Sequence, residues 1–99
     1  MRIAFDDDDL RALASQPGFH LHRYGADLER AFRKVIGLLD SASSQAELRN
    51  FKGLRLEQLK GDLSGFHSVR LNKQWRLILE FTKNEMEQQI IVIKIVDYH

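Results

Sequence analysis

The sequence predicts an α+β fold, in which an N-terminal strand and two to three helices pack on a small, mainly antiparallel sheet. Two patterns carry this prediction. Between residues 28 and 39 apolar side chains recur with helical spacing, whereas from residue 54 onward they follow the period of strands. A chain of 99 residues that is 43% hydrophobic can bury one core but not two. We therefore expect a single domain spanning residues 1–99.

The first strand and the first helix have local signals. Residues 2–5 are short and apolar enough to form a strand. Four aspartates follow, and their charge complements the dipole of a helix that starts there. Leu10, Leu13 and Ala14 then supply an apolar stripe, and the pair Pro17 and Gly18 ends the segment.

Two further helical segments are expected before residue 54. Residues 28–39 have one apolar and one charged face, which predicts an amphipathic helix that packs on the sheet. Ser44 and Glu47 have the spacing of a capping box. This spacing predicts a third helical turn that runs to about Phe51 and buries Leu48.

Four strands are expected in the second half, at residues 54–59, 66–71, 75–81 and 90–96. Their short connections favour an antiparallel meander. In the third of them, Trp75, Leu77, Leu79 and Phe81 share one face, and Arg76, Ile78 and Glu80 share the other. The fourth is almost continuously apolar, so we expect it to have strands on both sides and helices over it.

Composition excludes several classes of protein. The chain has no cysteine, which rules out a disulfide scaffold, a thiolate metal site and a cysteine nucleophile. No apolar run approaches the length of a membrane span, and the N-terminus is acidic where a signal peptide would be apolar. We therefore expect a cytoplasmic protein without a membrane partner.

Basic charge is concentrated in the middle of the chain. The net charge is only +1, but residues 49–76 contain seven lysines and arginines against two acidic residues. Such a stretch can collect phosphates. The alternative is a solvated sheet face that carries Lys and Arg at its exposed positions.

Ionisable side chains also cluster at residues 97–99, directly after the apolar strand. Asp97, Tyr98 and His99 can all handle protons, and a central strand would hold its last residues in place. A frayed tail is the alternative. His20 and His22 lie between the first two helices without further ligand spacing, so we expect no metal site.

Arg76 and Lys60 are candidates for binding a phosphate. Arg76 lies on the less apolar face of its strand, and Arg suits planar recognition of phosphate or carboxylate. A cross-strand ion pair with Glu57 or Glu80 is the alternative for Arg76. Lys60 precedes Gly61 at a strand end, where an ammonium group either approaches a phosphate closely or is simply solvated.

Four segments carry a resemblance to a known family: GLRLEQLKGD at residues 53–62, GFHSVRLN at 65–72, QWRL at 74–77 and IVDYH at 95–99. In order and spacing they are similar to the HigB branch of the RelE toxin superfamily. The resemblance implies a RelE-like fold and a toxin that cleaves messenger RNA on the translating ribosome. It further implies chemistry without a metal or cofactor, and neutralisation by a helix-turn-helix antitoxin of the HigA kind.

The resemblance also implies which residues act. Carried over by position, the family's motif falls on Lys60, Arg76, Asp97, Tyr98 and His99, while some members place a His where this chain has Glu57. We assign the phosphate to Arg76 and Lys60, the role of general acid to His99, and a contact with a nucleobase to Tyr98. Glu57 or Asp97 then serves as the general base or as an orienting group.

Other residues of the basic stretch are expected to bind the RNA backbone through their charge. These are Lys52, Arg55, Arg70 and Lys73. His67 could lie close enough to the site to matter, but a surface position on the sheet is the preferred interpretation for it.

Two other functions stay open on the sequence alone. One is a non-enzymatic toxin like the ParE branch, which acts on DNA gyrase; the other is a catalytically silent domain that binds RNA or an antitoxin. The ending Asp97-Tyr98-His99, together with Lys60 and Arg76, favours the nuclease, because a gyrase inhibitor would not require it. Glu57 in place of a His is the feature that most favours the silent domain.

Overall fold

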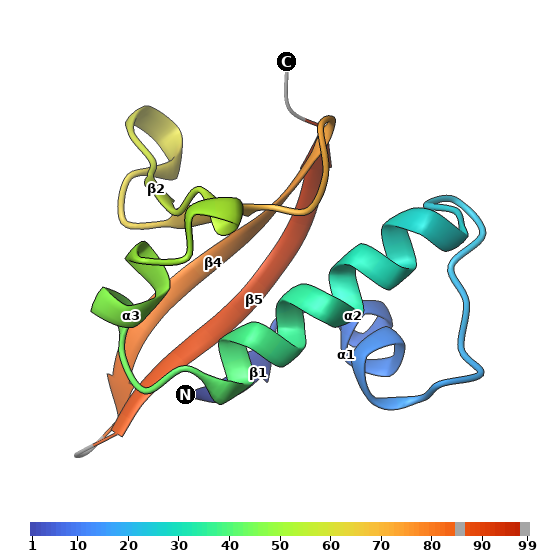
Figure 1. The fold of residues 1–99 in the computed structure, drawn as a ribbon, viewed down its shortest axis with the longest axis horizontal. Helices are drawn as coiled ribbons and strands as arrows, with labels where there is room; N and C mark the ends of the chain where they lie inside the picture. The colour runs from blue at the N-terminus through green and yellow to red at the C-terminus, as the bar shows by residue number, and fades with distance from the viewer. Residues whose placement is uncertain (85–86, 98–99) are drawn as a thin grey trace.

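The computed structural model describes residues 1–84 and 87–97. Helices and strands follow in the order β1 (Arg2–Phe5), α1 (Asp8–Ser15), α2 (Ala26–Ser41), α3 (Gln45–Arg49), β2 (Glu57–Gln58), β3 (His67–Arg70), β4 (Trp75–Asn84) and β5 (Glu87–Asp97). Two short 3-10 turns, η1 (Lys52–Leu54) and η2 (Gly61–Leu63), flank β2. The predicted α+β fold is confirmed, with α2 running across the sheet (Figure 1).

The five strands form one sheet in the order β1-β5-β4-β3-β2. β1 pairs in parallel with β5, and the other neighbours pair antiparallel, which confirms the meander of the last four strands. β5 lies between β1 and β4, as its nearly continuous apolar sequence predicted. The register shifts between Ile78 and Leu79, whose partners on β5 are Lys94 and Val92. This irregularity keeps apolar residues of both halves of β5 on the core side.

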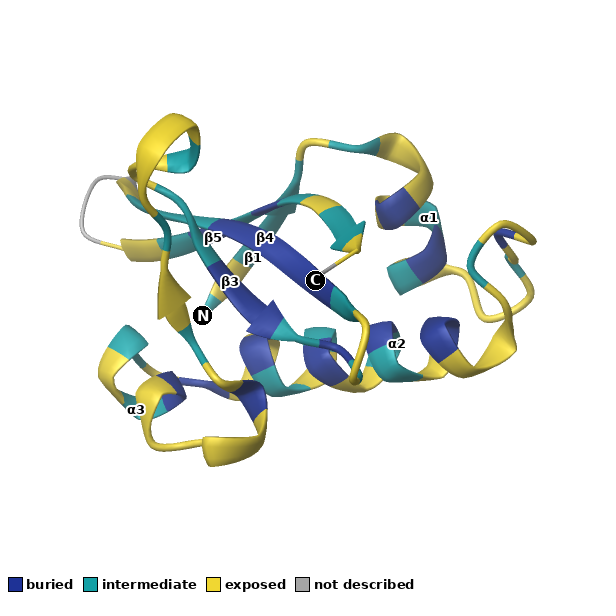
Figure 2. Ribbon diagram, turned by 90° about the horizontal axis from the view of Figure 1, so that it is seen from above, coloured by how far each residue is buried: buried dark blue, intermediate teal, exposed yellow. Residues whose placement is uncertain are grey.

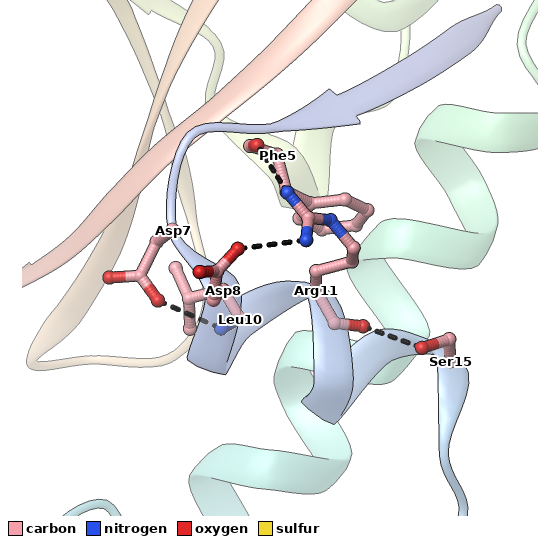
Figure 3. A network of polar contacts seen from close by, with 6 residues as sticks. All are labelled: Phe5, Asp7, Asp8, Leu10, Arg11 and Ser15. Carbon is pink, nitrogen blue, oxygen red and sulfur yellow. Dashed lines mark hydrogen bonds and ion pairs between the residues drawn. The ribbon is translucent and has the colours of Figure 1, made fainter.

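The run of aspartates starts α1. The carboxylate of Asp7 accepts the backbone N–H of Leu10 at 2.9 Å, which satisfies one of the open donors of the first turn. Arg11 pairs with Asp8 at 2.8 Å and reaches the carbonyl oxygen of Phe5, at the end of β1 (Figure 3). These contacts join the first strand to the first helix.

The core lies between the helices and one face of the sheet. Phe32 and Leu39 on α2 are fully buried, and they belong to one apolar cluster with Leu77 and Leu79 of β4 and Val92 of β5. Figure 2 shows the buried strand centres facing α2. Packing of the apolar side of α2 against the sheet stabilises this helix more than helix propensity does.

The predicted third helical turn is present as α3. The hydroxyl oxygen of Ser44 accepts the N–H of Glu47 at 3.1 Å, and the carboxylate of Glu47 accepts the N–H of Ser43 at 3.0 Å. Leu48 is fully buried, as expected. The cap therefore orients a short helix whose apolar residue completes the core.

A buried carboxylate holds the connection between α1 and α2. Glu29 accepts hydrogen bonds from the ring of His20 at 2.8 Å and from the N–H of Leu21 at 2.6 Å. The hydrogen bond from His20 is the main reason that the pKa of Glu29 is lowered. His20 therefore helps to hold the connection between α1 and α2 in place.

One expected strand is largely absent. Residues 54–59 were predicted as extended, but the structure has η1 through Leu54 and only a two-residue strand at Glu57–Gln58. Arg55 explains the difference, because it adopts a left-handed conformation with φ 47° and turns the chain between the two elements. Within residues 1–84 and 87–97, no helix combines the length and the apolar character that a membrane crossing requires.

Candidate functional site

Several of the polar residues predicted to form the functional site lie on the sheet face opposite the core. Register places Arg76 between Arg70 on β3 and Val96 on β5, and it places Glu57 opposite Ser68. Directly opposite residues share a face, and Arg76 alternates with the core residue Leu77. The predicted division of β4 into an apolar and a less apolar face is therefore confirmed.

Arg76 is the most constrained of these candidates, with only 6% of its surface exposed. Its Nε donates to the hydroxyl of Ser68 at 2.8 Å, and its Nη2 donates to the carbonyl oxygens of Arg55 at 2.6 Å and Ser68 at 3.2 Å. A planar guanidinium with two of its nitrogens held in this way cannot swing. The fold thus presents a fixed positive charge on the sheet.

Glu57 lies beside that charge. Its carboxylate is 3.9 Å from Nη2 of Arg76, and 53% of the Glu57 side chain is exposed. The distance is that of a loose ion pair, which leaves carboxylate oxygens accessible from solvent. The ion pair between Arg76 and Glu57 was one interpretation of the sequence; the geometry shows it together with an open carboxylate.

A hollow of about 210 Å³ lies at the end of this face, lined by Arg55, Arg70, Asn72, Lys73 and Arg76. Its lining holds four cationic side chains and no acidic one. Three of the four predicted RNA-binding residues therefore meet Arg76 in one place. The fourth, Lys52 on η1, is outside this lining.

Asn72 is the lining residue that sequence reasoning missed. Its side-chain oxygen accepts the N–H groups of Gln74 and Trp75, both at 2.9 Å, and its carbonyl oxygen accepts Nε of Arg70 at 3.1 Å. It therefore builds the turn that joins β3 to β4. The available signal was an Asn at the first position of a polar turn, where this residue type commonly bonds the backbone ahead of it.

The other predicted catalytic residues are placed less closely together. Asp97 pairs with Trp75 at the same end of β4, and its carboxylate accepts the amide of Gln74 at 3.1 Å. Lys60 is exposed and follows Glu57 by three residues, about 10 Å along an extended chain, and it is not in the lining of the cationic hollow. Tyr98 and His99 lie outside the described residues.

His67 lies away from the cationic hollow. It pairs with Leu79 on the core side of the sheet, its ring packs edge-on against Phe81 at 4.9 Å, and Nε2 is 3.3 Å from the side-chain amide of Gln45. Nδ1 is buried without a partner among the described residues. Burial, and then the charge of Arg49, lowers the pKa of His67. The preferred interpretation of His67 as a surface residue of the sheet is therefore only partly right, because its ring is half-buried against Gln45 of α3 and Phe81.

The described residues hold no group of three or more His, Asp or Glu side chains that could bind a metal ion. What they do hold is a fixed guanidinium, an open carboxylate and a cluster of cations. This arrangement fits a polyanionic ligand whose phosphates approach the sheet beside Arg76.

Comparison with known proteins identifies the family of the chain. The family model of a RelE-like toxin of the type II toxin–antitoxin system HigB matches residues 3–99. Toxin HigB-1 of Vibrio cholerae serotype O1 is 39% identical over 56 residues, a match that spans 57% of this chain and 59% of that toxin.

Solved structures agree on the fold. The YoeB/ParE toxin from Agrobacterium tumefaciens superposes over 100% of both chains with a TM-score of 0.61 at 21% identity. A chain of the YoeB-YefM complex from Staphylococcus aureus gives a TM-score of 0.57 at 17% identity, covering 100% of this chain and 97% of that one. Since the family model spans nearly the whole sequence, the chain belongs to the HigB-like family of RelE-like toxins of type II toxin–antitoxin systems.

Proposed function

We propose that residues 1–99 form a single toxin domain that cleaves messenger RNA on the translating ribosome, without a metal or cofactor. The observation that carries the proposal is the fixed guanidinium of Arg76, which lies beside the open carboxylate of Glu57 and a hollow lined by cations. Family membership supports the same activity. A phosphodiester at this position would have its charge next to Arg76 and its ribose within reach of a carboxylate.

The reaction proposed here is transesterification of RNA. A base removes the proton of the ribose 2′-hydroxyl, the resulting alkoxide attacks the adjacent phosphorus, and an acid protonates the 5′-oxygen that leaves. Glu57 or Asp97 serves as the base or orienting group, and His99 serves as the acid. Each acid or base in such a step typically contributes about 10²- to 10⁴-fold in rate.

Arg76 stabilises the negative charge that develops on the phosphate. Its bonds to Ser68 and to the carbonyl of Arg55 orient the guanidinium before the substrate arrives, so little reorganisation accompanies the reaction. We assign Lys60 to the phosphate as well, and Tyr98 to a contact with a nucleobase. Lys52, Arg55, Arg70 and Lys73 contribute affinity through the RNA backbone.

The proposed partners are the ribosome with its message and an antitoxin. The Staphylococcus aureus structure is a complex of YoeB with YefM, which supports a partner protein for this chain too. We propose that the partner is a HigA-like helix-turn-helix protein encoded next to this chain. An isolated gene whose expression is harmless would count heavily against the proposed toxin function.

The test is cleavage of a defined message on programmed ribosomes by the purified protein. We expect cuts within the message for the wild type and not for R76A, whereas K83A, at an exposed site at the far end of β4, should cut normally. Cleavage products should appear only when ribosomes are present. Inhibition of DNA gyrase without RNA cleavage would instead establish the ParE-like function, and ribosome binding without cleavage would establish a silent domain.

A further inference from the structure

A second hollow, of about 280 Å³, lies on the helix side of the molecule between α2, η1 and the end of β3. Its floor is apolar, made by Val35 and Leu38 of α2 with Leu54 and Leu71. At its rim lies Phe51, which is 41% exposed and is the one exposed large apolar side chain among the described residues. We call this feature the α2–η1 groove.

The rim of the α2–η1 groove is positively charged. Lys34 is exposed on α2 at one wall, and Arg70 of β3 lies at another. The lining contains no acidic residue. A ligand that suits this groove places apolar side chains on the floor and carboxylates at the rim, which is the pattern of an acidic amphipathic segment.

Arg70 belongs to both hollows. It lines the α2–η1 groove and also the cationic hollow beside Arg76, so its side chain forms part of the wall between them. Within the described residues, its guanidinium makes one hydrogen bond, from Nε to the carbonyl of Asn72. The terminal nitrogens therefore have the capacity to pair with a carboxylate in the groove or with a phosphate in the cationic hollow.

We propose that the α2–η1 groove seats an acidic amphipathic segment of the antitoxin, and that this segment competes with RNA by pairing with Arg70. Apolar side chains of the segment pack beside Phe51, and its carboxylates pair with Lys34 and Arg70. The inference rests on the proposed toxin function. It adds that neutralisation acts through an arginine shared by two neighbouring sites, because one guanidinium cannot serve a carboxylate and a phosphate at full strength together.

The first experiment measures the affinity of the full-length protein for the antitoxin encoded beside it. We expect K34E and F51A each to weaken this affinity about tenfold, since both remove a rim contact, while K83E leaves it unchanged. Cleavage of messenger RNA on ribosomes should stay within twofold of wild type for all three variants. Wild-type affinity in K34E and F51A would overturn the inference.

Other outcomes are equally decisive. If the variants raise the ribosome concentration needed for cleavage and leave antitoxin affinity intact, the groove contacts the ribosome and the inference is wrong. If F51A does not fold, K34Q is used in its place. The affinity of K34Q for the antitoxin should depend less steeply on salt than the affinity of the wild type does. An unchanged salt dependence would overturn the inference. If the wild type does not cleave RNA, the proposed function is wrong. If the variants cleave RNA normally and are still fully neutralised by the antitoxin, only the proposed role of the groove is wrong.

The second experiment tests the shared arginine. A 2′-O-methyl RNA oligonucleotide, which cannot be cleaved by this reaction, is added at saturating concentration to the toxin before the antitoxin. We expect it to weaken antitoxin binding to the wild type severalfold and to have little effect on R70Q, because thermodynamic coupling passes through that side chain. Equal competition in both proteins would overturn the role of Arg70.

Discussion

The two faces of the sheet are built from the same strands but are stabilised differently. Toward α2, β4 contributes Leu77 and Leu79 to an apolar cluster; on the opposite face it contributes Arg76, which is also buried. Burial of an apolar side chain stabilises a fold through the area removed from water. Burial of a guanidinium destabilises a fold unless acceptors surround it. The stability of the core face therefore depends on how well apolar side chains fill the space, and the stability of the polar face depends on specific hydrogen bonds.

This difference explains where a reaction can be located. Ser68 and the carbonyl of Arg55 hold Arg76 in one orientation, and Glu57 is close by but half exposed. An apolar face offers no such fixed charge, and a solvated lysine offers charge without orientation. The polar face thus combines the burial of a core with the chemistry of a surface.

The largest effect is expected from a change on the core face. Phe32 is fully buried on α2, so F32A should lower the free energy of unfolding by about 3–5 kcal/mol through reduced burial and the cavity left behind. Urea denaturation measures this decrease. K34A, at an exposed position two residues along the same helix, should change stability by less than about 0.5 kcal/mol. Equal decreases in both variants would show that α2 is not packed as described.

A change at Arg76 on the polar face should slow the reaction in the protein that remains folded, in addition to any loss of stability. R76A should slow single-turnover cleavage by about 10²- to 10³-fold at saturating ribosome, because the charge that stabilises the developing phosphate is gone. R76K should also be slow, since an ammonium cannot reproduce the bonds to both Ser68 and Arg55. A normal saturated rate for R76A would reduce Arg76 to a structural ion-pair residue.

Acid should weaken the packing of α3 through His67. The pKa of His67 is lowered in the folded protein, mainly by burial, so the unfolded chain binds its proton more readily. The contribution of neutral His67 is present above the ordinary His pKa of about 6.5 and is lost as pH falls toward the depressed value of the folded state. Thermal unfolding between pH 7 and pH 5 should show this loss.

H67F provides the matched comparison for that pH dependence. It removes both the titration and the buried, unpaired Nδ1, so the variant should lose less stability than the wild type over the same pH range. H22A, at an exposed position in the connection before α2, should behave like the wild type. An unaltered pH profile in H67F would place the acid-sensitive group elsewhere.

The smallest effects separate charges that gather RNA from the charge that acts on it. For single-stranded RNA, each phosphate that a variant no longer neutralises should lower the slope of log affinity against log salt by about 0.7. Arg55 lines the cationic hollow, so R55A should lower the slope and be partly rescued at low salt; K52A should have a smaller effect. If R76A were rescued by low salt in the same way, its distinction from Arg55 would disappear.

Much of the fold could be predicted because its signals are local. The aspartates before α1, the capping box of Ser44 and Glu47, and the alternation along β4 each involve residues within a few positions of one another. The prediction of a strand over residues 54–59 was wrong because of the backbone conformation of a single residue. Arg55 adopts a left-handed conformation that no apolar pattern reports, and η1 ends there.

The sequence predicted which residues belong to the candidate site, and the structure showed how they are arranged. Arg76 and Glu57 were both singled out, and the structure places them 3.9 Å apart. Asn72 was missed because its role is to form a turn. His67 was expected at the surface, whereas its ring is half-buried beside Gln45 of α3. The groove beside Phe51 could not be anticipated, since its walls come from segments far apart in the chain.

The sequence by itself determined the order of the elements, the faces of β4 and the concentration of positive charge in residues 49–76. Only the tertiary structure decided that Arg55, Arg70 and Lys73 meet Arg76, and that Arg70 borders two hollows at once. The physical reason is the range of the interactions. Periodicity and capping act within a turn or two of chain, whereas the position of a charge on a sheet depends on strand register and on the side chains that pack across it.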